Sequence, residues 1–152
     1  MDAFESNLND VLVDTFNLIL KYEELSLKKA INAPITISEA HIIEAVGKQS
    51  GKEATVSELA SFLNISSPTV TVAVKKLEQK GFIKKTPCEK DGRRTIISLT
   101  DMGGRIERIH RLFHVKMVKK LSDRFPEEEK EVLLRAINTL RDFFKVKVEA
   151  KA

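Results

Sequence analysis

Two of the three histidines have a spacing that suits metal chelation. His110 and His114 lie four residues apart, so on a helix they share one face. Two imidazoles at this spacing can bind a transition metal such as zinc. Histidines at surfaces and dimer contacts also occur at this spacing without binding a metal. The pair therefore predicts a metal site as one of two alternatives.

One acidic residue, Glu23, interrupts an apolar pattern near the N-terminus. It continues a stripe of apolar residues at helical spacing, which consists of Leu12, Phe16 and Ile19. A carboxylate on such a face is costly to bury unless a cation or a metal accompanies it. We therefore expect Glu23 to have a partner of that kind.

These residues do not form a recognisable catalytic motif. The sequence has no His-Glu-x-x-His motif, no glycine-rich phosphate loop and no nucleophile elbow. A metal-dependent hydrolase built on His110 and His114 rests on their shared helix face alone. We therefore expect that the chain is not an enzyme.

A second set of residues suits nucleic-acid binding. Residues 56–75 fit a helix-turn-helix in which Asn64 lies in the turn and Ser66 caps the second helix. The outward face of the second helix carries hydroxyls, valine methyls and lysines, which suit phosphates and base edges in a DNA major groove. The candidate DNA-binding residues of this helix are Ser66, Ser67, Thr69, Thr71, Val72, Lys75 and Lys76. The alternatives are a helical hairpin that only packs and a module that binds only other proteins.

A predicted β-hairpin follows this helix. Residues 82–86 and 95–99 are rich in β-branched and aromatic side chains, and the turn-forming residues 89–92 lie between them. Its tip carries Lys90, Asp91, Arg93 and Arg94. A narrow minor groove concentrates negative potential and attracts an inserted arginine. An ordinary polar turn is the alternative interpretation of the tip.

Composition and charge favour a DNA-binding protein of the cytoplasm. The 152 residues are 42% hydrophobic and 32% charged, with no apolar run of membrane-spanning length and an acidic start that does not resemble a signal peptide. The single cysteine, Cys88, excludes a disulfide within the chain and fits a reducing compartment.

Residues 55–100 hold eight basic and four acidic side chains, a net +4 that equals the charge of the whole chain. Such a confined basic region is typical of a polyanion-binding surface, although a mixed solvated surface is the alternative.

Long helices are predicted on both sides of this region. Apolar residues at helical spacing run from Phe4 to Leu25 in two stripes, and further helices are expected over 36–48, 55–63, 66–80, 100–121 and 126–148. A small domain cannot cover both stripes of the first helix, so we expect a second chain to pack there. The expected fold is mainly α with a small β-wing.

Two segments resemble the MarR family of bacterial transcriptional regulators. Residues 91–100 are similar to the family's wing signature, an Asp-x-Arg followed by a strand that ends in Leu-Thr, and residues 77–83 are similar to its exit from the recognition helix. The resemblance covers nearly the whole chain. It implies a winged helix-turn-helix DNA-binding domain over 34–100, flanked by dimerisation helices over 1–33 and 101–152. It also implies an obligate homodimer that binds palindromic double-stranded DNA, usually as a repressor, with Arg93 in the minor groove.

Two branches of the family share features with this chain and imply different effectors. Glu23-Glu24, Ala40-His41 and residues 110–118 resemble the repressors of fatty-acid synthesis genes, which respond to acyl carrier protein through an apolar tunnel. The set Glu23, His41, His110 and His114 resembles the primary site of zinc-sensing members, which control metal uptake genes. The resemblance to the fatty-acid branch is the preferred interpretation, zinc is the alternative, and another small apolar ligand is a third.

Overall fold

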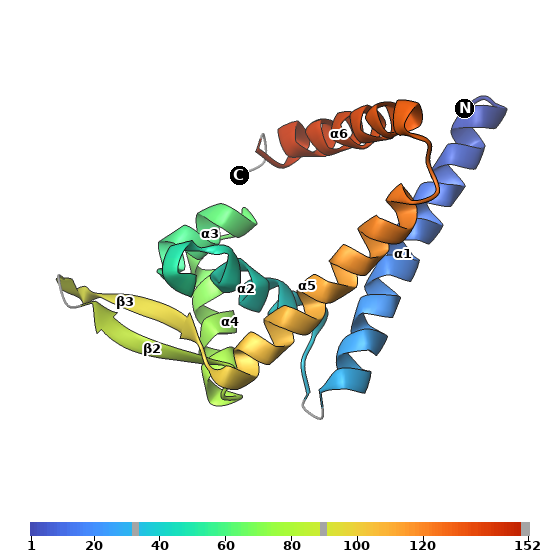
Figure 1. Cartoon of the computed structure of the whole chain (residues 1–152). Coiled ribbons are helices and arrows are strands. Elements are labelled where there is room, and N and C mark those ends of the chain that lie inside the picture. The colour runs from blue at the N-terminus through green and yellow to red at the C-terminus, as the bar shows by residue number, and fades with distance from the viewer. Residues whose placement is uncertain (32–33, 89–90, 150–152) are drawn as a thin grey trace. The chain divides into compact units, whose positions relative to one another are not determined.

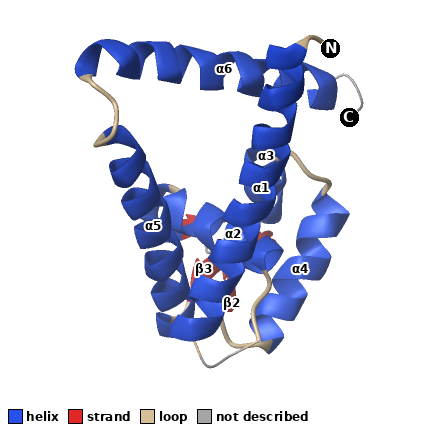
Figure 2. Cartoon of the chain, turned by 90° about the vertical axis from the view of Figure 1, so that its right-hand side faces the viewer, coloured by secondary structure: helices blue, strands red, loops and turns tan. Residues whose placement is uncertain are grey.

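The computed structural model describes residues 1–31, 34–88 and 91–149, except for the side chains of residues 91–93 and 149. The chain divides into two compact units, Met1–Phe113 and His114–Ala152. Helices predominate, and the strands of the described chain all belong to the first unit (Figure 2). Within the described residues, no helix combines the length and apolarity required to cross a bilayer.

The first unit contains a long helix, a helix-turn-helix and a small sheet (Figure 1). The elements of the unit are α1 (Ala3–Ala30), α2 (Ile37–Lys48), the 3-10 turn η1 (Ser50–Lys52), β1 (Glu53–Ala54), α3 (Val56–Leu63), α4 (Ser67–Gln79), β2 (Ile83–Cys88), β3 (Asp91–Leu99) and the first half of α5 (Asp101–Ser122). The sheet is antiparallel in the order β1-β3-β2. The fold is thus the predicted one, mainly α with a small β-wing.

Local capping explains where the helices of this unit begin. Thr36 and Glu39 form a capping box at the start of α2, in which each side chain bonds the other residue's backbone N–H. Thr55 and Glu58 do the same for α3. Asn64 ends α3 in the left-handed conformation with φ of 53°, as its place in the predicted turn requires. These helix starts confirm the sequence predictions.

The core of the first unit lies where α2, α3, α4 and the sheet meet. Its largest fully buried side chains include Phe82, Leu59, Leu77, Ile97 and Ile43. The start of α5 closes this core, because Gly103 lies directly against the backbone of Phe82. A Cβ at Gly103 would collide with the Phe82 carbonyl oxygen. The absence of a side chain at this position therefore permits the packing.

Three details differ from the sequence predictions. The hairpin strands are longer than expected, since β2 extends to Cys88 and β3 begins at Asp91, so that Asp91 belongs to a strand rather than to the turn. A third strand, β1, pairs with β3 through only two residues, too few for a visible pattern. An apolar residue between the two helices of a helix-turn-helix is expected to pack at their crossing, but Ile65 is 39% exposed.

The second unit contains the rest of α5 and α6 (Glu127–Glu149). Pro126 precedes α6, and three glutamates occupy its first turn, where a negative charge meets the positive end of the helix dipole. Apolar residues at helical spacing form a stripe along α6 that is only partly covered, since Ile137, Phe144 and Val148 are all exposed.

Most of the apolar side chains on α1 are also exposed. Phe4 is 72% and Leu18 is 64% exposed, whereas only Glu23 and Leu27 of this helix are buried. Apolar surface on this scale is typical of an interaction site. The expectation of a second chain packed on α1 stays a prediction.

Candidate functional site

Helix α4 has one buried and one exposed face. Val70, Val74 and Leu77 are buried at helical spacing and hold the helix against the core. The candidate DNA-binding residues on and before α4 are all exposed: Ser66, Ser67, Thr69, Thr71, Val72, Lys75 and Lys76. The structure therefore brings the whole predicted set of this helix to one accessible face.

Several hydroxyls on this face bond within the helix itself. The Ser66 hydroxyl accepts from the Thr69 backbone N–H at 3.3 Å and lies 2.7 Å from the Thr69 hydroxyl. The Thr71 hydroxyl donates to the Ser67 carbonyl at 2.9 Å. The Ser66 bond caps the first turn of α4, and the Thr71 bond is the local side-chain-to-backbone bond that threonine forms within helices. They also reduce the number of hydroxyl protons that remain for a ligand.

The wing contributes one candidate residue whose side chain is described. Arg94 is exposed on β3. Lys90 lies outside the described residues, and Asp91 and Arg93 are placed as strand residues by their backbone alone. The hydrogen bonds from the Thr55 backbone and hydroxyl lower the pKa of Glu58, and the nearby charge of Arg94 lowers it further. Cys88, at the end of β2, is half-buried.

Polar contacts join the end of α4 to its neighbours. Lys85 on β2 pairs with Glu78 at 2.7 Å. The Thr100 hydroxyl donates to the Gly81 carbonyl at 2.7 Å and accepts from the backbone N–H of Gly103. The recognition helix, the wing and the start of α5 are therefore held together around one short turn.

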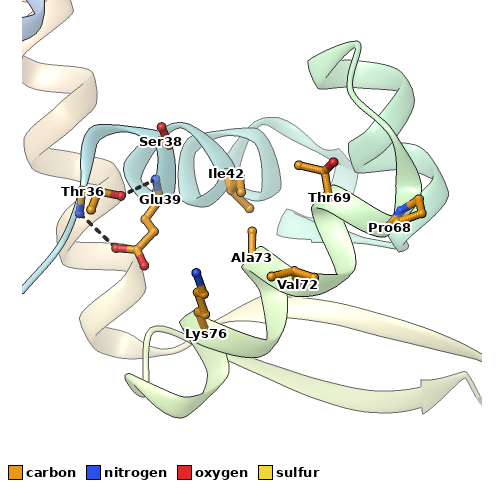
Figure 3. Close-up of a pocket in the computed structure, with 9 residues that line it drawn as sticks. All are labelled: Thr36, Ser38, Glu39, Ile42, Pro68, Thr69, Val72, Ala73 and Lys76. Atoms are coloured by element: carbon orange, nitrogen blue, oxygen red, sulfur yellow. Dashed lines mark hydrogen bonds between the residues drawn. The ribbon is translucent and has the colours of Figure 1, made fainter.

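A groove of about 580 Å³ lies between the start of α2 and the exposed side of α4. Figure 3 shows its lining residues: Thr36, Ser38, Glu39, Ile42, Pro68, Thr69, Val72, Ala73 and Lys76. Sequence reasoning did not identify Ser38 as part of this surface. Its place in the first turn of a capped helix was visible, but its position across from Lys76 depends on how α2 and α4 pack.

A separate cluster of ionisable side chains lies inside the first unit. Glu23 on α1 and His110 on α5 are both buried, and His41 on α2 is partly exposed. The Glu23 carboxylate lies 3.4 Å from His110 Nε2 and 3.9 Å from His41 Nε2. Glu23 is thus buried next to two imidazole rings, and the metal-binding role of this set stays a prediction.

The opposite edge of the His110 ring faces a second carboxylate. Glu44 on α2 lies 3.1 Å from His110 Nδ1. Sequence reasoning missed Glu44, although its spacing of three residues from His41 places both on neighbouring positions of one helix face. His114, the fourth predicted ligand, lies one turn later on α5 and begins the second unit.

The donor set of this cluster fits zinc. One ligand atom from each of Glu23, His41 and His110 lies within 4.8 Å of the others. Two ligands that are each about 2.0–2.1 Å from a tetrahedral zinc lie roughly 3.4 Å apart, and His-rich sets with one carboxylate are common for this metal. A carboxylate on the far nitrogen, as Glu44 provides, fixes the ring orientation of a ligating histidine.

Comparison with known proteins gives a consistent result. The model of the MarR family matches residues 35–95. The HTH-type transcriptional regulator BilQ of Clostridium symbiosum is 34% identical over 107 residues, which are 70% of this chain and 72% of BilQ. Transcriptional regulator ZitR of Lactococcus lactis is 28% identical over 128 residues, which are 82% of this chain and 86% of ZitR. The crystal structure of Streptococcus pneumoniae FabT in complex with DNA matches with a TM-score of 0.84 and 33% identity, over 93% of this chain and 97% of that chain.

Proposed function

This chain belongs to the MarR family of transcriptional regulators, and from that premise we propose that it is a dimeric repressor of palindromic operators. The chain is a DNA-binding regulator rather than an enzyme, in line with its relatives. Helix α4 enters the major groove, and the hairpin of β2 and β3 reaches the minor groove through Arg93.

The observation that carries this proposal is the two-sided character of α4. Its buried face anchors the helix, while its outward face presents hydroxyls, Val72 and the lysines Lys75 and Lys76. No acid precedes Glu78 on this helix. A rigid helix with this surface suits a negatively charged groove.

The groove beside α4 extends the same surface. The Ser38 hydroxyl lies at one edge, and the Lys76 ammonium lies at the other (Figure 3). A sugar-phosphate strand that follows the groove would meet both of these groups. Phosphate contacts of this kind set the register of a protein on its duplex. We therefore propose that this groove binds one sugar-phosphate strand of the operator.

The exposed apolar face of α1 supports the dimer. Residues 1–33 and 101–152 supply the dimerisation helices in this proposal, and residues 34–100 form the DNA-binding domain. A palindromic operator mirrors the two-fold symmetry of such a pair of chains.

Selection from a random duplex pool, followed by fluorescence anisotropy, tests this function. We expect the selected sequence to be palindromic and to bind two chains per duplex. The logarithm of the affinity should fall linearly with the logarithm of the salt concentration, with a slope of about −0.9 for each phosphate contact. A folded protein that retains no duplex from the pool at low salt would overturn the proposal.

For the effector, we propose acylated carrier protein and control of fatty-acid synthesis genes. This rests on the similarity of Glu23-Glu24, Ala40-His41 and residues 110–118 to the fatty-acid branch of the family. Zinc-responsive control of metal uptake genes is the second candidate. It is favoured by the geometry of Glu23, His41 and His110, which would hold the metal together with His114. Bound zinc would supply a divalent charge that draws α1, α2 and α5 together.

One pair of measurements separates the two effectors. Protein purified without chelators is assayed for metal content beside the double variant His110→Ala/His114→Ala. Zinc that is near stoichiometric in the first protein and lost in the second supports the metal sensor. A metal-free protein whose operator affinity rises with acylated, but not with unacylated, carrier protein supports the fatty-acid branch.

A further inference from the structure

Val72 lies at the centre of the exposed face of α4. Successive helix residues are about 100° apart, so Val72 points roughly opposite to the buried Val70 and Val74. Its side chain is 57% exposed. A β-branched residue at such a position is a weak helix former and leaves its methyl groups in water. The centre of this face is therefore apolar.

The neighbouring hydroxyl of Thr71 is already engaged. It donates its proton to the Ser67 carbonyl of the preceding turn. What Thr71 retains for a ligand is an acceptor lone pair and a methyl group. Ser66 and Thr69 bond each other in the helix cap, so they too are poorly placed to donate to a base edge.

The residue types that recognise purines by paired hydrogen bonds are missing from most of α4. All of its residues are described, and it contains no arginine, asparagine or histidine. Its single glutamine, Gln79, is the last residue of the helix. Arginine recognises guanine, and asparagine or glutamine recognises adenine, through such pairs. Lysine, which can also contact guanine, is the exception on this face, and Lys75 and Lys76 each offer a compact point charge that equally suits phosphates.

Apolar contact is thus the chemistry that this face offers to base edges. In the major groove, the 5-methyl group of thymine is the apolar feature of the base pairs. We propose that Val72 is a specificity-determining residue that packs on a thymine 5-methyl group in each operator half-site, with the Thr71 methyl beside it. This inference rests on the proposed function, because it requires α4 to lie in a major groove.

Replacement of thymine by deoxyuridine tests the contact directly, since it removes the 5-methyl group and leaves base pairing unchanged. The substitution is made one thymine at a time in the selected operator, and affinity is measured by anisotropy. We expect a loss of about fourfold at one or two positions per half-site, the ratio that corresponds to burial of one methyl group. Thymines outside the half-sites serve as the control and should give no loss.

The variant Val72→Ala assigns the effect to this residue. On the thymine operator, we expect it to bind several-fold more weakly than the natural chain. On the deoxyuridine operator, the variant and the natural chain should differ much less, because the partner methyl is already gone. The side chain is exposed, so the variant should fold normally, which circular dichroism and thermal unfolding would verify.

The outcomes distinguish this inference from the function on which it rests. Salt-dependent binding that is insensitive to deoxyuridine at every position would overturn the role of Val72 and leave the DNA-binding function intact. An equal loss for Val72→Ala on both operators would do the same. If no duplex is retained at all, the proposed function fails, and the inference fails with it.

Discussion

The Lys80 ammonium contacts both carboxylate oxygens of Glu39, at 2.7 and 2.8 Å. Lys80 caps the end of α4, and Glu39 belongs to the capping box that starts α2. The Glu39 side chain is only 11% exposed. Partial burial raises the pKa of Glu39, but the bonds from Lys80 and from the Thr36 backbone outweigh it and hold the pKa below its ordinary value.

Lys80→Ala should therefore destabilise the protein near neutral pH. We expect a loss of about 1 kcal/mol in the free energy of unfolding, the upper end for a partly exposed ion pair. Because the pKa of Glu39 is lowered in the folded state, its stabilising contribution is present above the ordinary carboxyl pKa. That contribution disappears as the pH falls through the lowered value.

Urea titrations of both proteins between pH 3 and pH 7 would measure this difference, which should shrink toward the acidic end. Lys75→Ala, an exposed lysine on the same helix, is the matched control and should have little effect. A difference that stays constant over the whole range would contradict the assigned role of the pair.

Two adjacent glycines of α5 should respond in opposite ways to alanine. A Cβ at Gly103 would collide with the Phe82 carbonyl, whereas a Cβ at Gly104 would meet nothing within 4 Å. Gly103→Ala should cost about 2 kcal/mol or more through overpacking. Gly104→Ala should gain up to about 1 kcal/mol from helix propensity. Thermal and urea unfolding would measure both, and equal effects would show that the close approach is unimportant.

Charged residues of the wing and of α4 should contribute to DNA binding in different ways. Arg93→Ala should weaken operator binding by about 1–3 kcal/mol if its guanidinium occupies the minor groove. Lys75→Ala should weaken binding to all sequences alike and reduce the salt slope by about 1. Anisotropy at several salt concentrations would measure both variants. Arg141→Ala on α6 is the control, and an equal loss for this variant would indicate a general charge effect.

Glu44 should influence zinc affinity by orienting the His110 ring. It faces His110 Nδ1 at 3.1 Å, and loss of a carboxylate that orients a ligating histidine typically lowers affinity by about 10–100-fold. Glu44→Gln should show such a loss in competition with a chelating dye. Glu53→Gln, an exposed carboxylate on β1, should leave the affinity unchanged. If the natural chain and Glu53→Gln both fail to take zinc from the dye, zinc is not the effector.

Features determined by residues close together in the sequence were predictable. The capping boxes at Thr36 and Thr55, the turn at Asn64 and the two faces of α4 follow from short-range spacing, and the structure contains all of them. The buried position of Glu23 was also predictable, because one acidic residue in an apolar stripe requires a compensating partner.

Features that depend on long-range packing were not predictable. The contact of Glu44 with His110 joins α2 to α5, and no spacing or motif in the sequence indicates that these two residues are neighbours. The same holds for Ser38, whose place across the groove from Lys76 depends on the packing of α2 and α4. A two-residue strand such as β1 is too short to leave a periodic pattern.

The contact between Gly103 and Phe82 has a mechanical consequence. There is no space for even one methyl group between these two residues, and the Thr100 hydroxyl is bonded to the Gly81 carbonyl. The first turn of α5 is therefore packed tightly against the turn that follows α4. His110 lies about two turns further along the same helix. We therefore expect a tilt of α5 at that level to move α4 with it.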